Sequence, residues 1–309
     1  MKVAFLYGGQ GSQEVGVGYD FYENEKIAKD FYDNIKIDKD IKKLSFNSDK
    51  ETLKNTENTQ VVLVAFDILV TKMLNENKIY PDAVAGLSIG EFGALYASEV
   101  LKEEDVLKIS EFRGEKMKTA SKNIDTAMFA VMGVSEEELE KICKKNSDDI
   151  NFVSISNLNT KNQIVISGER KSVLKAVEDI KSLGKRAIEL NVSGPFHTKY
   201  MEDVSSSLKK YFKEIEFSKE KIDVYYNLLG NKNKDSLDTK EIMVRQVSEC
   251  VRFEDILRNM IKDGIDTFIE IGYFGVLKGF IKKIDRGVKV YSISDYDSYK
   301  ELLREIKDE

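Results

Sequence analysis

Cysteine, histidine and long apolar runs are scarce in this chain of 309 residues. Its two cysteines cannot form a disulfide framework and indicate a reducing compartment. No group of cysteine and histidine residues has the spacing of metal ligands, so we expect no metal. The longest apolar run, from Val61 to Val70, is interrupted by Asp67 and is far shorter than a membrane span. These shortages argue against a disulfide scaffold, a metal centre and a transmembrane helix.

The chain also has no excess of positive charge, because it contains 48 basic and 54 acidic residues and its formal net charge is −6. The balance gives no general argument for nucleic-acid binding, and an acidic partner would need a local Lys/Arg patch. The apolar start MKVAFLYGG is too short for a signal peptide and is typical of a first strand. We therefore expect a cytoplasmic monomer that binds neither nucleic acid nor membrane.

The stretch DAVAGLSIGEFGALYA, residues 82–97, is the strongest motif. An apolar run, a central GLSIG and a helix-period pattern match the nucleophile elbow, in which a strand turns sharply into a helix. A Cβ at Gly86 or Gly90 would crowd such a turn. Ser88 would then lie at a helix N-terminus, where backbone N–H groups favour developing negative charge. The alternative is a serine that only caps a helix.

Alternating apolar runs and amphipathic segments predict an α/β fold with a mainly parallel sheet that helices cover on both faces. Strands are expected at Val3–Tyr7, Ala83–Ala85, Val224–Asn227, Thr267–Ile271 and Val288–Ile293. Short outer helices are expected between Phe21 and Lys54, and longer ones at Gln60–Leu74, Glu103–Lys122, Asp203–Ile215, Thr239–Glu249, Phe253–Lys262, Phe274–Ile284 and from Asp297.

A segment from Asp125 to Asn191 differs from its surroundings. Its expected order is strand, helix, strand, strand, helix, strand, which is typical of a ferredoxin-like unit. The expected elements are strands at Ala127–Val131, Phe152–Ser156, Gln163–Ser167 and Arg186–Val192, with helices from a Ser135–Glu138 capping box to Lys145 and at Glu169–Leu183. We predict a large α/β catalytic domain over residues 1–124 and 192–309 and an inserted subdomain over 125–191, with an Asn-rich turn between its second and third strands.

Two further features lie away from the elbow. The glycine-rich stretch at residues 8–13 lacks both the Walker lysine and a G-x-G-x-x-G register, so it favours a turn that points backbone N–H groups at a neighbouring site. Arg113 lies on the inward stripe of its helix, where a guanidinium must find an anionic partner. A snorkelling side chain or a structural ion pair is one explanation, and a carboxylate clamp for a ligand is the other.

His197 is the only histidine, and it lies in GPFHT at residues 194–198. A serine nucleophile in this chain has only this imidazole as a general base, and its ordinary pKa suits proton transfer near neutrality. Gly194 and Pro195 would fix the loop that presents it. A purely structural histidine is the alternative.

Together these motifs resemble the malonyl-CoA:acyl carrier protein transacylases, within the acyltransferase family of fatty acid and polyketide synthesis. The resemblance covers essentially the whole chain. It rests on GQGSQ at 9–13, GLSIGEF at 86–92, EFRGEKM at 111–117, NQIVISG at 162–168, GPFHT at 194–198, VRQV at 244–247 and EIG at 270–272. The resemblance implies an α/β-hydrolase-like large domain with an inserted ferredoxin-like subdomain, in agreement with the pattern.

The resemblance also implies residue roles. Ser88 would be the nucleophile and His197 its base, with the imidazole oriented by a backbone carbonyl near Gln246. The backbone N–H groups of Gln10 and Ile89 would form the oxyanion hole, and Arg113 would pair with the malonyl carboxylate. The implied reaction is ping-pong transfer of malonyl from malonyl-CoA to the phosphopantetheine thiol of acyl carrier protein for fatty acid synthesis, with the CoA thioester as substrate and no separate cofactor.

The chain departs from the family pattern next to these positions. Leu87 stands where the family has histidine before the serine, Gly8 where proline is usual, and Tyr273-Phe274 follow EIG in place of a Pro-Gly element. We expect these changes to affect the acyl pocket and not the reaction, and Phe196 fits a malonyl-selective loop. Two other functions stay open, a discrete acyltransferase of a polyketide pathway and a serine thioesterase or hydrolase.

Overall fold

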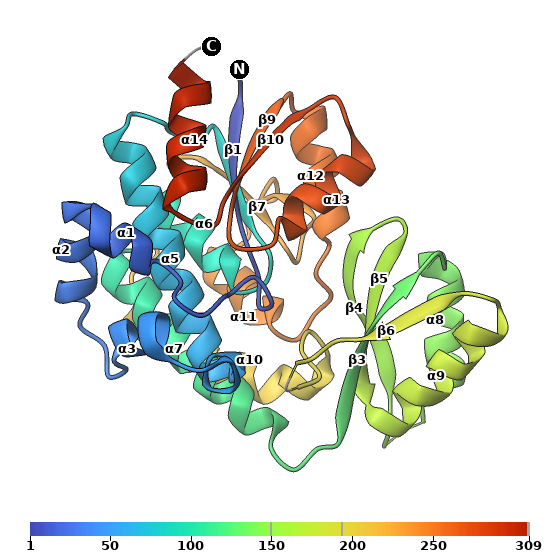
Figure 1. The fold of residues 1–309 in the computed structure, drawn as a ribbon. Coiled ribbons are helices and arrows are strands. Elements are labelled where there is room, and N and C mark those ends of the chain that lie inside the picture. The colour runs from blue at the N-terminus through green and yellow to red at the C-terminus, as the bar shows by residue number, and fades with distance from the viewer. Residues whose placement is uncertain (149, 193, 308–309) are drawn as a thin grey trace.

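The computed structural model describes residues 1–148, 150–192 and 194–307. Its larger part is built on a six-stranded sheet with the order β10-β9-β1-β2-β7-β8 (Figure 1). Neighbouring strands are parallel except β7 and β8, so the predicted mainly parallel sheet is confirmed. The strands are β1 (Val3–Tyr7), β2 (Ala83–Gly86), β7 (Asp223–Tyr226), β8 (Asn231–Lys232), β9 (Thr267–Ile271) and β10 (Lys289–Ile293). Only the short edge strand β8 was not predicted.

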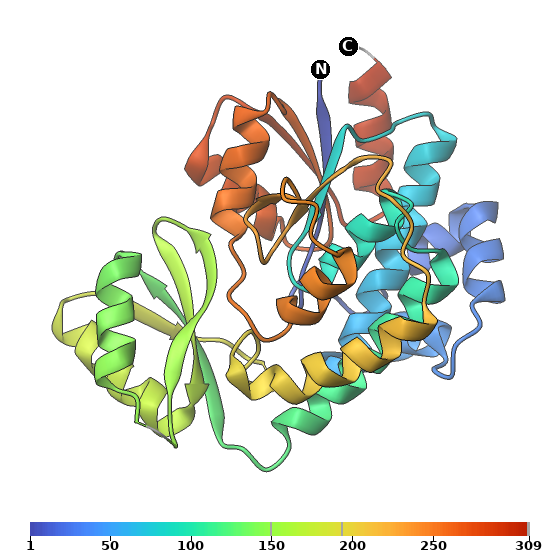
Figure 2. The same cartoon turned by 180° about the vertical axis from the view of Figure 1, so that it is seen from behind.

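Helices cover both faces of this sheet (Figures 1 and 2). Side chains of a strand alternate between faces, so Phe5 and Tyr7 of β1 pack in one core with α5 and α6, while Ala4 and Leu6 pack in a second core with α12 and α13. The helices of this part are α1 (Tyr19–Asn24), α2 (Lys26–Asn34), α3 (Ile41–Asn47), α4 (Lys50–Lys54), α5 (Thr56–Glu76), α6 (Gly90–Ala97), α7 (Glu103–Ser121), α10 (Glu202–Tyr211), α11 (Thr239–Gln246), α12 (Phe253–Lys262), α13 (Val276–Ile284) and α14 (Tyr296–Lys307).

The predicted helix ends differ from the observed ones at several places. Helix α5 begins at Thr56, four residues before the predicted start. Helix α13 begins at Val276 and not at Phe274, because Phe274 and Gly275 both have left-handed backbone angles, with φ of 71° and 60°. Helix α10 ends at Tyr211 and continues as a short 3-10 turn, so the predicted end at 215 is wrong.

The second part of the chain is an antiparallel sheet with two helices on one face (Figure 1). Its elements are β3 (Thr126–Met132), α8 (Glu136–Lys145), β4 (Val153–Thr160), β5 (Gln163–Glu169), α9 (Arg170–Ser182) and β6 (Arg186–Glu189). The sheet order β4-β5-β3-β6 and the predicted succession of elements are those of a ferredoxin-like unit, so that fold prediction is confirmed. All six elements lie within the range 125–191.

Two details of this unit differ from the prediction. Strand β4 extends to Thr160, so the Asn-rich segment belongs to the strand and the turn is only Lys161-Asn162. The segment stays extended because Asn157, Leu158 and Thr160 continue to pair with β5. The N–H of Leu158 also donates to the carbonyl of Val251 at 2.8 Å, outside the unit. Strand β6 ends at Glu189 and not at residue 192, where the chain leaves the sheet for the larger part.

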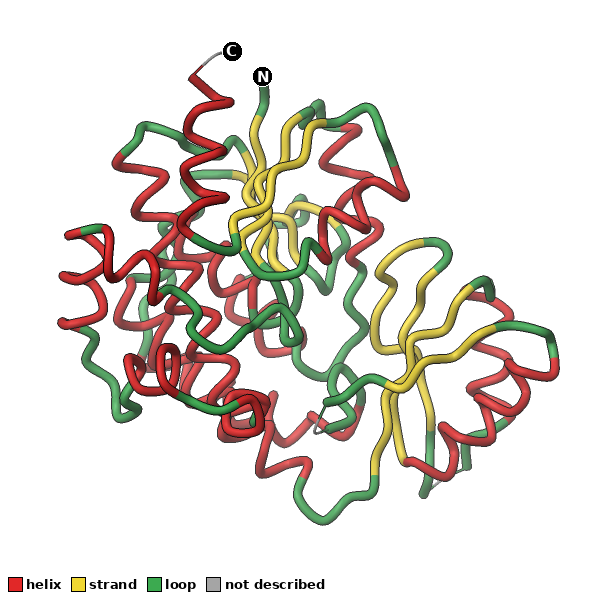
Figure 3. The backbone as a smooth tube through the Cα atoms, viewed as in Figure 1, coloured by secondary structure: helices red, strands yellow, loops and turns green. Residues whose placement is uncertain are grey.

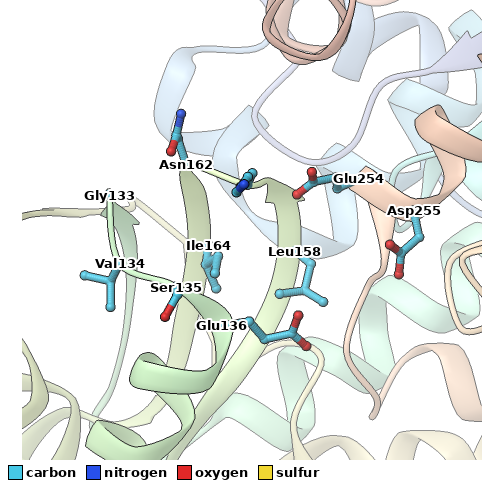
Figure 4. Close-up of a pocket in the computed structure, with 10 residues that line it drawn as sticks. Gly133, Val134, Ser135, Glu136, Leu158, Asn162, Ile164, Glu254 and Asp255 are labelled. Carbon is cyan, nitrogen blue, oxygen red and sulfur yellow. The ribbon is translucent and has the colours of Figure 1, made fainter.

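A cavity of about 360 Å³ lies between this unit and α12 (Figure 4). The carboxylates of Glu254 and Asp255 border it from α12. Each already has a cationic partner, because Glu254 pairs with Arg258 and Asp255 with Arg252. None of the six predicted site residues lines this cavity, so it is separate from the predicted chemistry.

Two predicted absences concern the membrane and the cysteines. Over the described part of the chain, no helix combines the length and the apolar character needed to cross a bilayer. Cys143 and Cys250 are both free.

Candidate active site

The predicted elbow forms a strand, a tight turn and a helix at the carboxyl edge of the large sheet. Figure 3 shows the loops that follow the parallel strands meeting at this edge, on the side of the ferredoxin-like unit. Ser88 has φ of 56°, a left-handed conformation that is strained for a residue with a Cβ. A Cβ on Gly86 would overlap the carbonyl of Gly90, and one on Gly90 would overlap the carbonyl oxygen of Tyr7. The predicted need for both glycines is therefore confirmed.

Gly86→Ala is expected to lower the free energy of unfolding by about 3 kcal/mol, because the new methyl group has no space against backbone atoms that cannot move aside. Urea unfolding followed by circular dichroism measures the change. Gly279→Ala is the matched control, since a Cβ at this position of α13 meets nothing within 4 Å and alanine favours the helix. Equal stability of the two variants would contradict the close packing of the elbow.

A relay of hydrogen bonds joins the elbow to His197. Ser88 Oγ lies 2.7 Å from His197 Nε2, and His197 Nδ1 lies 2.9 Å from the backbone oxygen of Gln246. A carbonyl oxygen only accepts, so Nδ1 carries the proton and donates it. The lone pair of Nε2 then faces the serine hydroxyl and accepts its proton. The geometry is that of a serine with an adjacent general base.

Burial and, to a smaller extent, the nearby charge of Arg113 lower the pKa of His197 to about 4, although the hydrogen bond to Gln246 acts in the opposite direction. The imidazole is therefore neutral throughout the physiological pH range. A neutral imidazole can accept a proton, whereas an imidazolium cannot.

The single histidine makes this pKa directly measurable. We expect the imidazole C–H signals of His197 to titrate in NMR spectra with a midpoint of about 4, since the folded protein disfavours the charged form. The base form is present above this pH and is lost as the pH falls through it. The urea-unfolded chain should titrate near pH 6.5. Arg113→Met should raise the folded midpoint, and a folded midpoint at or above 6.5 would contradict the prediction.

Arg113 is fully buried beside the serine. Its Nη1 donates to Gln60 Oε1 at 2.9 Å, and its Nη2 donates to Gln246 Oε1 at 3.1 Å and to Ser88 Oγ at 3.3 Å. No carboxylate among the described residues lies within ion-pair distance, and Nε has no partner there. Snorkelling and a direct structural ion pair are therefore both wrong. Burial lowers the pKa of Arg113 to about 10, which leaves it charged at neutral pH.

The two predicted oxyanion donors lie on the loops that flank Ser88. Gln10 follows β1 in the glycine-rich loop, and a Cβ on the neighbouring Gly9 would approach the carbonyl oxygen of Leu87 to 2.8 Å. Ile89 follows the serine directly. Within the described residues, neither backbone N–H donates to a protein acceptor. Both are thus available to a ligand, and their role in an oxyanion hole stays a prediction.

Two residues of the site were missed by the sequence analysis. Glu91 is fully buried and accepts hydrogen bonds from the backbone of Asn227 and from the side chain of Gln246. Asn227 Oδ1 in turn accepts from the backbone N–H of Ser88 at 2.7 Å. Both residues could have been found from the sequence. Glu91 is the one charged residue of an otherwise apolar helix, and Asn227 follows a strand at the carboxyl edge of the sheet. Burial raises the pKa of Glu91 to about 8, against its two hydrogen bonds and the charge of Arg113.

A cavity of about 230 Å³ opens onto Ser88 and His197. The glycine-rich loop and Leu87 line it from the larger part, and Met128 and Asn159 line it from the ferredoxin-like unit. Leu87 therefore gives the cavity an apolar wall where the family pattern has an imidazole. An acyl group that enters this cavity reaches the serine between the two parts of the chain.

Comparisons with known proteins agree with this arrangement. The model of the acyl transferase domain matches residues 4–306. The malonyl CoA-acyl carrier protein transacylase of Bacillus subtilis is 36% identical over 311 residues, which cover 100% of this chain and 98% of the relative. The crystal structure of a malonyl CoA-acyl carrier protein transacylase from Clostridium perfringens matches with a TM-score of 0.95 and 33% identity, over 100% of this chain and 98% of that chain.

A third match is a malonyl transacylase in complex with a type II polyketide acyl carrier protein. It has a TM-score of 0.93 and 26% identity, and the match covers 99% of this chain and 100% of that chain. The domain match and the full-length identity to the bacterial relatives agree with the elbow, the buried base and the fold. This chain belongs to the acyl transferase family.

Proposed function

We propose that the protein transfers a malonyl group from malonyl-CoA to the phosphopantetheine thiol of an acyl carrier protein in fatty acid synthesis. The observation that carries the proposal is the guanidinium of Arg113, which lies 3.3 Å from the Ser88 hydroxyl without a carboxylate partner among the described residues. A substrate with a carboxylate next to its thioester supplies the missing anion at this point. The names of the relatives, which are malonyl transacylases, support the same donor and acceptor.

The first half of the reaction loads the serine. His197 takes the proton of Ser88 as Oγ attacks the thioester carbonyl of malonyl-CoA, and the resulting oxyanion accepts from the N–H groups of Gln10 and Ile89. Each such donor contributes about 3–4 kcal/mol in comparable sites. The intermediate then collapses, the carbon–sulfur bond breaks, and the CoA thiolate leaves with the proton from His197. The product is a malonyl ester of Ser88 and free CoA.

The second half repeats these steps in reverse. His197 takes the proton of the carrier thiol, the sulfur attacks the ester carbonyl, and the proton returns to Ser88 Oγ as the malonyl group leaves. Proton transfer and the two backbone donors suffice for both halves. The proposal therefore includes no metal and no cofactor besides the CoA thioester, which is a substrate.

A polyketide pathway is the second candidate setting. The similarity to a transacylase bound to a type II polyketide carrier favours it, because such an enzyme uses the same chemistry and differs in the carrier protein. Rates of malonyl transfer to the fatty acid carrier and to polyketide carriers of the same cell distinguish the two. We also propose that the protein acts in the cytoplasm as a monomer, and the two free cysteines support a reducing compartment.

Intact mass spectrometry after brief incubation with malonyl-CoA tests the proposal. We expect one malonyl adduct, which peptide mapping locates on Ser88 and which holo acyl carrier protein removes within the turnover time. Failure to form an adduct with any acyl-CoA would overturn the acyltransferase proposal. Rapid loss of the adduct to water, without carrier protein, would favour a thioesterase.

A further inference from the structure

Glu91 is a buried carboxylate whose two oxygens have different partners. It lies in the first turn of α6, three residues after Ser88, and no part of it reaches solvent. Oε1 accepts from the backbone N–H of Asn227 at 3.0 Å, and Oε2 accepts from Gln246 Nε2 at 2.9 Å. Burying a carboxylate is costly unless its hydrogen bonds are made, so both contacts matter for keeping it in place.

The contact with Gln246 determines which way its side-chain amide points. Gln246 Nε2 donates to Glu91 and also to the backbone oxygen of Ser88 at 2.7 Å. Two acceptors on one side therefore hold the NH₂ group there, and the amide oxygen faces Arg113 Nη2 at 3.1 Å. The reverse orientation would place the NH₂ group against a guanidinium, which only donates, and the oxygen against a carboxylate, which only accepts when ionised.

This arrangement places the carboxyl group of Glu91 near Arg113 without a direct ion pair. Glu91 acts on the guanidinium through the intervening amide of Gln246. When Glu91 is ionised, its charge opposes the effect of burial on the pKa of Arg113. Gln246 takes only one of the guanidinium donors, at Nη2, and Gln60 takes one at Nη1. Nε has no partner among the described residues, so Arg113 keeps a donor for the carboxylate of a substrate.

We propose that Glu91 is a positioning residue for donor selectivity, which fixes the Gln246 amide so that Arg113 remains presented to a substrate carboxylate beside Ser88. The inference rests on the proposed function and goes beyond it by assigning part of the preference for a carboxylated acyl group to a residue that the substrate does not touch.

Glu91 also supports the elbow, and the two roles have different consequences. Asn227, which donates to Glu91, accepts from the N–H of Ser88 and donates through Nδ2 to the carbonyl of Gly86 at 2.6 Å. Loss of the contact between Glu91 and Asn227 changes the position of the nucleophile, so it slows the loading of every acyl group equally. Loss of the contact between Glu91 and Gln246 changes the position of Arg113, so it slows only the loading of acyl groups that carry a carboxylate. The ratio of malonyl to acetyl loading therefore separates the two roles.

Glu91→Gln tests the proposal, because it keeps the size of the side chain but offers one oxygen and one NH₂ group to two donors. One buried donor is left unsatisfied or Gln246 turns its NH₂ group toward Arg113. We expect kcat/KM for loading Ser88 from malonyl-CoA to fall about 100-fold, and that from acetyl-CoA to fall less than about tenfold. Quenched-flow loading with each CoA ester, followed by intact mass spectrometry, measures both. Equal losses with the two donors, or no loss, would overturn the proposal.

Asp67→Asn is the matched control. Asp67 is also a buried carboxyl group, on α5, but its Oδ2 has no hydrogen-bond partner in the described chain. Its backbone oxygen accepts from Thr71 of the same helix. We expect its ratio of malonyl to acetyl loading to equal that of the wild type. A fall like that of Glu91→Gln would show a general effect of buried charge and overturn the assignment.

Gln246→Met keeps the inference testable if Glu91→Gln does not fold, because it removes the amide but keeps the backbone carbonyl that faces His197. The same selective loss is expected, and Glu91→Gln added to Gln246→Met should not lower the ratio further. An unselective loss in Gln246→Met would overturn the proposal. A wild-type protein that loads no acyl group at Ser88 would instead remove the proposed function, and this inference with it.

Discussion

Ser88→Ala is expected to abolish the malonyl adduct and to lower the rate of transfer by about 10⁵–10⁶-fold, the order seen when a serine hydrolase loses its nucleophile. The hydroxyl contacts both the Nε2 of His197 and the guanidinium of Arg113. Without it, the base has no proton to take and the acyl group has no acceptor. Intact mass spectrometry with malonyl-CoA and a carrier-loading assay measure the two losses.

A matched control is Ser98→Ala. Ser98 is fully buried, whereas Ser88 is half-buried, and it lies at the other end of the helix that follows the elbow. Its Oγ donates to the carbonyl of Leu95 within that helix. We expect normal loading in this variant and an unchanged fold in both. If Ser88→Ala still formed the adduct, another residue would have to be the nucleophile and the proposed mechanism would be wrong.

Arg113→Ala is expected to lower kcat/KM for malonyl-CoA by about 10²–10³-fold, the cost of about 3–4 kcal/mol for removing one partner of a buried charged contact. Loading from acetyl-CoA should fall much less, since acetyl has no carboxylate for the guanidinium to hold. Quenched-flow loading rates with the two CoA esters measure the difference. Equal losses would reject the carboxylate clamp and leave Arg113 with a purely structural role.

Arg113→Lys tests whether the positive charge alone is enough to hold the substrate carboxylate. Lysine keeps the positive charge but cannot donate at the same time to Gln60, Gln246 and a substrate carboxylate with the geometry of a planar fork. We expect malonyl loading between that of the wild type and that of Arg113→Ala. Loading as fast as in the wild type would mean that charge alone, and not the fork, holds the substrate.

Most of the fold and the core of the site could be predicted from the sequence. The strands Val3–Tyr7 and Thr267–Ile271 and the helix Phe253–Lys262 have the predicted bounds, because strand and helix periods are local properties of the chain. The elbow is local too, since the glycines that it needs lie two residues on either side of Ser88. His197 could be found because it is the only imidazole, and no choice of partner was required.

The partners of these residues were decided by the tertiary structure. Ser88 and His197 are 109 positions apart, and Gln246 is 158 positions from Ser88, so no local pattern fixes their distances. The same holds for the missed residues Glu91 and Asn227, which meet across 136 positions. Their roles arise because parallel strands bring their carboxyl ends to one edge, where side chains from distant segments become neighbours.

The sequence by itself thus determined the nucleophile motif, the candidate base and a family resemblance that the comparisons support. Only the folded chain decided that Arg113 lies beside Ser88 without a carboxylate partner among the described residues, and that burial keeps His197 neutral. Both properties depend on which groups surround a side chain and on how much water is excluded from it. Burial and electrostatic environment are set by contacts across the whole fold, and these contacts do not follow from residue types along the chain.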